Sequence, residues 1–202
     1  MDTVGLDLAA IREMSGVASD NRTGMEDDMT ESLKTLIAET QAAFKADPEK
    51  AKATFTSVSK LQDGMQTVAA MRQHKITVDE PEALGGTDTG PNPVELVLAA
   101  LGTCQEITYR AYATALGIPL DGVSVAIEGD IDLRGFFAVD ESVRAGYQAI
   151  RGTVTLESSA SEADLQKLRE IVNAHCPVMD ILAGTVPVEL SLKTSSVADA
   201  AE

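Results

Sequence analysis

The sequence is poor in aromatic side chains: it has no Trp and only three Tyr and four Phe among its 202 residues. Hydrophobic residues nevertheless make up 44% of the chain, so we expect a core built from Ala, Val, Leu and Ile. A chain of this length fits one domain with an appendage, or at most two small domains.

Basic residues are also scarce, with 16 Lys and Arg against 32 Asp and Glu and a net charge of −16. Nucleic acids and anionic membrane surfaces are bound by concentrated Lys and Arg, so we expect neither as a partner. The sequence has no apolar run of the roughly 20 residues that would span a membrane. It also lacks the basic segment followed by an apolar segment that marks a secretory signal, which predicts a cytoplasmic protein.

Cysteine is rare as well, and Cys104 and Cys176 are too few for the disulfide scaffold of a small secreted domain. With His74 and His175 they could supply four zinc ligands, but the spacing is not that of a compact zinc site. A hydrolase pairing Cys104 with His175 is conceivable, although no oxyanion motif accompanies it. The segment 85–90 lacks the Gly-Lys-Ser/Thr ending of a phosphate loop. The sequence therefore predicts no metal and no cofactor.

The stretch from 80 to 116 organises the chain, because a turn-forming segment rich in Gly and Pro leads into a helical run. Residues 94–101 are apolar on almost every side, with Glu95 as the exception, and Cys104 lies near the middle of the run. A helix that is apolar all round is a buried helix. Its cover is expected from a second helix and from a second copy of the chain, which predicts an intertwined homodimer.

The pattern of the first 48 residues predicts helical structure. A short amphipathic piece is expected at 6–14 and a loop at 19–24. A longer helix is predicted to begin with Thr30 as its N-cap and to end at Asp47-Pro48. Its apolar stripe, which must dock on the main domain or on a partner subunit, consists of Leu33, Leu36, Ile37, Thr40 and Phe44.

Beyond Pro48 the pattern changes to alternation, which predicts strands. They are expected at 53–58 and 65–78 on either side of a turn at 62–64, with 65–78 as either one long strand or two broken ones. Further strands are expected at 123–133, 149–156 and 186–192. Ser161 is a plausible N-cap for a second helix ending at 175–177, followed by a short piece at 178–183. Because no parallel βαβ repetition is present, the fold class is α+β with antiparallel sheets.

These patterns divide the chain into three parts. Residues 1–48 are predicted to be an N-terminal helical extension and residues 49–193 the main domain. Residues 194–202 are small and polar, which is typical of a disordered tail.

Several motifs together resemble one family, the OsmC/Ohr-like proteins. The matching residues are Asp79-Glu80-Pro81, Leu84-Gly85-Gly86, Gly90-Pro91-Asn92-Pro93, Glu95-Leu96, the run 98–102 before Cys104, the run 128–136, and Cys176-Pro177-Val178. The resemblance covers roughly residues 50 to 193. It implies two central helices packed against antiparallel sheets in a tight homodimer.

The best understood members of this family are thiol peroxidases that reduce organic hydroperoxides and hydrogen peroxide, whereas the branch with a stretch like 132–136 has no settled activity. The resemblance implies that Cys104, as a thiolate, attacks peroxide and becomes a sulfenic acid. Cys176 would then condense with it to a disulfide that an external dithiol reduces. The expected partners are thus a second copy, a peroxide substrate and a dithiol reductant.

The sequence departs from the family pattern at the carboxylate that directly follows Asn-Pro, since Val94 stands there and the acid comes one residue later, at Glu95. Nine residues separate Glu95 from Cys104, which at about 100° per residue places them on opposite sides of a straight helix. Glu95 therefore either acts across a dimer interface or only favours the helix N-terminus.

The sequence also leaves open which cation would activate the Cys104 thiol. Arg72, expected in the strand before the glycines, is the best candidate by position, and a solvated strand arginine is the alternative. The candidate catalytic residues are thus Cys104, Cys176, Glu95 and Arg72. The competing hypothesis is a non-enzymatic or small-ligand-binding dimer that keeps the fold without efficient peroxide chemistry, which the departure at Val94 favours.

Overall fold

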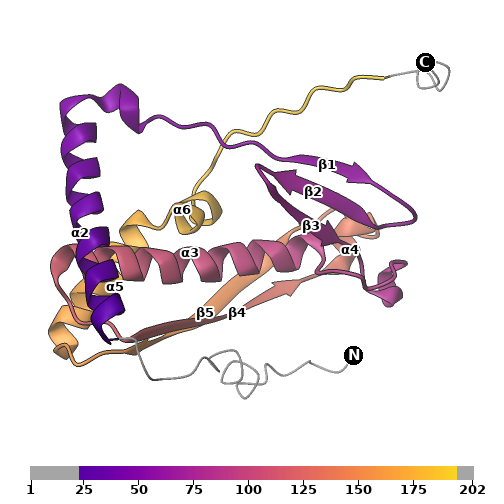
Figure 1. The fold of residues 1–202 in the computed structure, drawn as a ribbon. Coiled ribbons are helices and arrows are strands. Elements are labelled where there is room, and N and C mark those ends of the chain that lie inside the picture. The colour runs from indigo at the N-terminus through magenta and orange to yellow at the C-terminus, as the bar shows by residue number, and fades with distance from the viewer. Residues whose placement is uncertain (1–22, 195–202) are drawn as a thin grey trace. The chain divides into compact units, whose positions relative to one another are not determined.

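A computed structural model describes residues 23–194, with side chains from residue 30 onward (Figure 1). The chain divides after Ala51 into two compact units, each described here by itself. The predicted piece at 6–14, most of the predicted loop at 19–24 and nearly all of the predicted tail lie outside the described residues.

The first unit contains helix α2 (Thr23–Ala46) and the 3-10 turn η1 (Pro48–Ala51). The predicted N-cap at Thr30 was wrong, because Thr30 lies inside α2 and the helix begins seven residues earlier. The predicted end is confirmed, since Pro48 disfavours helical backbone at Asp47.

The second unit begins with an antiparallel three-stranded sheet in the order β1-β2-β3: β1 (Val58–Leu61), β2 (Thr67–Met71) and β3 (His74–Val78). The predicted turn at 62–64 is confirmed, and Gly64 adopts the positive φ of 58° that the turn needs. The strand predicted at 53–58 starts only at Val58, because Val58 pairs with the last-but-one residue of β2, Ala70, and little of β2 remains for residues 53–57 to pair with.

A glycine-rich segment with the 3-10 turn η2 (Glu82–Leu84) connects β3 to helix α3 (Pro93–Leu116). The backbone passes so close to itself that a Cβ on Gly86 would lie 1.8 Å from the carbonyl oxygen of Glu80. A Cβ on Gly90 would lie 2.3 Å from the carbonyl oxygen of Thr77. Only glycine fits such close approaches, so these positions hold the loop against β3 and aim the chain into α3.

The rest of the second unit packs around α3, which contacts β4, α5 and α6. The two long strands β4 (Gly122–Ile131) and β5 (Tyr147–Glu157) form an antiparallel pair in which Gly122 lies opposite Glu157. The short helix α4 (Leu133–Phe136) lies between them in sequence. Helices α5 (Glu162–His175) and α6 (Pro177–Ala183) follow, with Ser161 capping α5 as predicted. The α+β class with antiparallel sheets is confirmed.

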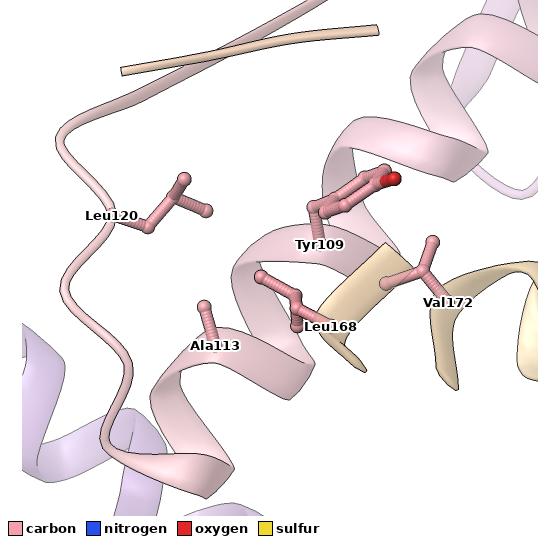
Figure 2. Packing of buried hydrophobic residues seen from close by; sticks show 5 residues of the cluster. All are labelled: Tyr109, Ala113, Leu120, Leu168 and Val172. Carbon is pink, nitrogen blue, oxygen red and sulfur yellow. The ribbon is translucent and has the colours of Figure 1, made fainter. Parts of the chain in front are cut away.

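The hydrophobic core lies where α3 meets α5 (Figure 2). Its buried members are Tyr109, Ala113, Leu120, Leu168 and Val172. The opposite face of α3 stays open in the single chain, where Ile107 is 70% exposed and Ala99, Ala100 and Thr103 are exposed beside it. The sequence predicted that α3 is buried on all sides, but in the single chain only one of its faces is buried.

The strand predicted at 186–192 does not form. A strand needs a neighbour to receive its backbone hydrogen bonds, and none pairs with this segment within residues 23–194. Its alternating apolar side chains remain in solvent, with Val188, Leu190 and Leu192 exposed at 81%, 91% and 89%. Among the described residues, no helix combines the length and apolarity needed to cross a membrane.

Candidate functional site: the cysteine pair

The two cysteines meet although 72 residues separate them in sequence, with their Sγ atoms 3.4 Å apart. Cys104 lies in the middle of α3 and is partly buried, whereas Cys176 is completely buried. Cys176 both ends α5 and precedes α6, with extended backbone at φ −75° and ψ 114°. The following Pro177 disfavours helical backbone at Cys176, so the chain breaks there and the sulfur lies against α3.

The surroundings of Cys104 raise the pKa of its thiol. Burial is the largest cause, and a hydrogen bond from the backbone N–H of Val178 opposes it. The neighbouring Cys176 raises the pKa further, while the hydroxyl of Thr108 lowers it. None of the described groups that shift this pKa is a cation. Cys104 of the single chain is therefore a thiol at neutral pH and a poor nucleophile.

Glu95 takes part in capping the N-terminus of α3. Its Oε2 accepts a hydrogen bond from the Asn92 N–H at 2.8 Å, and Asn92 Oδ1 accepts one from the Glu95 N–H at 2.9 Å. This reciprocal pair is a capping box, which satisfies two backbone donors that would otherwise lack partners. Within the described residues of the single chain, Glu95 thus has the helix-starting role, and no hydrogen bond joins it to Cys104. A role across a dimer interface stays a prediction.

Arg72 does not lie in a strand, and the predicted location was wrong. The segment 65–78 is split into β2 and β3 by a two-residue turn, with Met71 opposite His74. Arg72 occupies the first turn position with a φ of 56° and its side chain is exposed. Within the described chain no hydrogen bond or ion pair joins Arg72 to either cysteine.

A residue that the sequence analysis did not single out lies next to the catalytic candidate. Gln105 is only 3% exposed, and neither its Oε1 nor its Nε2 has a hydrogen-bond partner in the part of the chain that the structure describes. It lines a cleft of about 920 Å³ bordered by β4, β5, α3, α5 and α6. Gln105 lies in the polar stretch 102–106, so no signal in the sequence pointed to its burial.

Comparisons with known proteins agree with this architecture. Residues 86–191 match the family model described as OsmC-like protein. The chain is 25% identical over 118 residues to the uncharacterized protein YmaD of Bacillus subtilis, an alignment that covers 56% of this chain and 75% of YmaD.

Among solved structures, an OsmC-like protein from Mycoplasma pneumoniae superposes with a TM-score of 0.58 at 20% identity, covering 66% of this chain and 89% of that one. An organic hydroperoxide resistance protein from Legionella pneumophila gives 0.51 at 20% identity, covering 66% and 93%. One from Elizabethkingia anophelis gives 0.52 at 16% identity, covering 66% and 90%. At these identities the likeness concerns the fold. Taken with the family match over more than half of its length, the chain belongs to the OsmC-like family.

Proposed function

We propose that this protein is a thiol-dependent peroxidase that reduces organic hydroperoxides or hydrogen peroxide in defence against oxidative stress. The observation that supports the proposal is the 3.4 Å separation of the Cys104 and Cys176 sulfurs. Solved relatives of the same fold include organic hydroperoxide resistance proteins. A pair of thiols held at this distance suits a cycle in which both are oxidised together.

The cycle begins with Cys104 as the thiolate. It attacks the distal peroxide oxygen, the O–O bond breaks, and the departing alkoxide takes a proton to become an alcohol, leaving Cys104 as a sulfenic acid. The Cys176 thiol loses its proton and attacks the sulfenic sulfur, which releases water and forms the disulfide. The two sulfurs then move from 3.4 Å to about 2.05 Å. An external dithiol reduces the bridge and is itself oxidised.

The raised pKa of Cys104 means that this cycle needs a cation, and none within residues 30–194 of the single chain shifts the pKa of this thiol. We propose that Arg72 supplies it within a homodimer, since Arg72 extends from an exposed turn. A second copy would also cover the open face of α3 around Ile107 and offer a strand partner to 186–192. Glu95 then keeps its capping role at the start of α3.

The test is a thiol titration after adding one equivalent of cumene hydroperoxide to the reduced protein. We expect both thiols to be lost together, Cys104→Ser to abolish peroxide consumption, and Cys176→Ser to stop at a sulfenic acid that dimedone traps. Arg72→Gln should slow consumption, with Lys75→Gln in the adjacent strand as the control. Retention of both thiols in the wild type would reject the peroxidase.

The second candidate is a ligand-binding dimer without efficient peroxide chemistry. It is favoured by the raised pKa of Cys104 and by Val94, which replaces the family carboxylate and contributes only its carbonyl oxygen, to the Tyr147 hydroxyl at 2.8 Å. In the titration above, this candidate predicts that both thiols survive one equivalent of peroxide.

A further inference from the structure

The cleft of about 920 Å³ lies beside the cysteine pair, but neither sulfur lines it. Its volume is within the roughly 300–1,000 Å³ of sites that bind small molecules. One part of its wall is apolar and is formed by Leu101, Val125, Ile127, Val154, Met179 and Leu182. An apolar wall combined with a few polar groups is the usual composition of such a site.

Gln105 is the polar group deep in this cleft. Buried side-chain amides are normally hydrogen-bonded, yet both amide atoms of Gln105 lack a partner among the described residues. A glutamine amide presents N–H donors and a carbonyl acceptor side by side. Another amide complements both at once, so a ligand that carries one would satisfy Gln105.

Arginines give the cleft a positive character in a chain whose net charge is −16. Arg144, Arg151 and Arg169 line it with a single carboxylate, Glu162. Arg151 is neutralised by its ion pairs with two carboxylates on β4. Within residues 30–194, no carboxylate lies within ion-pair distance of Arg169, which is therefore available to an anion.

The positive charge of Arg169 is placed at one end of a row on α3. Burial raises the pKa of Tyr109, and the charge of Arg169 partly offsets this rise, so the guanidinium lies near the phenol. Figure 2 shows Tyr109 on α3 beside α5, the helix that carries Arg169. Leu101, Gln105 and Tyr109 follow one another at intervals of four residues, about 6 Å apart along the helix.

Along α3 this row presents an apolar side chain at Leu101, an amide at Gln105 and, beyond it, the positively charged end beside Arg169. A ligand that matches it has an apolar chain, an amide, and a carboxylate only a few bonds beyond the amide. A fatty chain whose polar group lies far from its carboxylate does not match, because the spacing between Gln105 and the Arg169 end is about one helical turn.

We propose that this cleft is a binding site for N-acyl amino acids, with the acyl chain against Leu101 and its apolar neighbours, the ligand amide paired with Gln105, and the carboxylate at Arg169. The site is separate from the cysteine chemistry and stands whether or not the protein reduces peroxides.

The experiment is isothermal titration of the full-length reduced protein with N-octanoylglycine. Two matched probes accompany it: undecanoate, which keeps the length and charge without the amide, and N-octanoylglycine methyl ester, which keeps the amide without the charge. We expect the wild type to bind N-octanoylglycine roughly tenfold more tightly than either, the effect of leaving one buried polar group unpaired. Equal affinity for all three probes, or no binding of any, would overturn the proposal.

Single substitutions test which residue makes each contact with the ligand. Gln105→Met should remove the preference over undecanoate, and Arg169→Gln should remove the preference over the methyl ester. Lys167→Gln, an exposed cation on the same helix outside the cleft, should change neither. Unchanged discrimination in Arg169→Gln, a substitution of an exposed side chain, would equally reject the site. The double variant Cys104→Ser/Cys176→Ser should retain binding, which separates this result from the outcome of the thiol titration.

Discussion

Two polar side chains of the same unit are almost equally buried, Asp79 at 2% exposure and Gln105 at 3%, yet their surroundings are opposite. The Asp79 carboxylate accepts hydrogen bonds from the backbone and hydroxyl groups of Thr87 and Thr89 and from the backbone of Glu80. The Gln105 amide has no partner within the described residues. A completed set of hydrogen bonds is typical of a structural residue, whereas an incomplete one leaves capacity for a ligand.

Asp79 holds the glycine-rich loop from which α3 starts. Its backbone N–H also donates to the carbonyl oxygen of Pro91 at 3.3 Å, two residues before the first residue of α3. The loop's geometry therefore sets the position of the helix that carries both Cys104 and Gln105.

The largest effect is expected for Asp79→Asn. An amide nitrogen facing the N–H groups of Thr87 and Thr89 would set donor against donor, so the loop would lose several hydrogen bonds at once. We expect the greatest loss of melting temperature among the substitutions in this section, measured by circular dichroism. Asp88→Asn, in the same loop but exposed, is the control and should leave melting nearly unchanged. Similar melting of the two variants would contradict the structural role of Asp79.

The second prediction concerns pH. Hydrogen bonding, above all from the Thr87 hydroxyl, holds the pKa of Asp79 well below the usual range of an aspartate. A depressed pKa in the folded state contributes stability above the unfolded pKa, and this stability is lost as pH falls through the folded value. The free energy of unfolding by urea should decline as pH drops below about 4. Asp79→Asn should decline less steeply over the same range, and parallel curves would refute the assignment.

The third prediction is a gain of stability, whereas the first is a loss. Gln105→Met removes an unpaired buried amide and keeps a side chain of similar size, so it should raise the free energy of unfolding by about 1–3 kcal/mol in the absence of ligand. The measurement is a urea titration with a rise in midpoint at unchanged slope. A loss of stability would show that the amide is paired after all and would remove the contrast with Asp79.

The smallest effect is expected at Glu95. Glu95→Ala breaks the capping box with Asn92 and should cost about 1 kcal/mol of stability. Because the side chain serves the helix start, the rate of peroxide consumption per folded molecule should stay unchanged. A large loss of that rate at full folding would restore Glu95 as a catalytic candidate.

Much of the fold could be predicted because its signals are local. Ser161 marks the start of α5 through its capping side chain, and Pro177 marks the break between α5 and α6 through its fixed backbone. The alternation in 123–133 and 149–156 correctly predicted the two long strands. Errors arose where local signals compete: Thr30 is a good N-cap, but the residues before it also continue the helix.

The candidate site was predictable only in part. The identity of the two cysteines followed from their rarity and from the family resemblance, and their meeting could be expected only by analogy. The turn at Arg72 was missed because Arg is an unusual residue for positive φ, and nothing nearby in sequence announces it. The unpartnered amide of Gln105 was not predictable at all, since pairing depends on what surrounds the residue in space.

The sequence by itself determined the end of α2, both ends of α5, the two long strands β4 and β5, the turn-rich entry to α3 and the class of fold, because these depend on propensities, caps and periodicities over a few neighbouring residues. The tertiary structure alone decided that sulfurs 72 residues apart lie 3.4 Å from each other, and that Asp79 is satisfied while Gln105 is not. It also left 186–192 unpaired despite a strand pattern. Distances, burial and pairing are properties of segments that meet only on folding, when packing brings distant residues together.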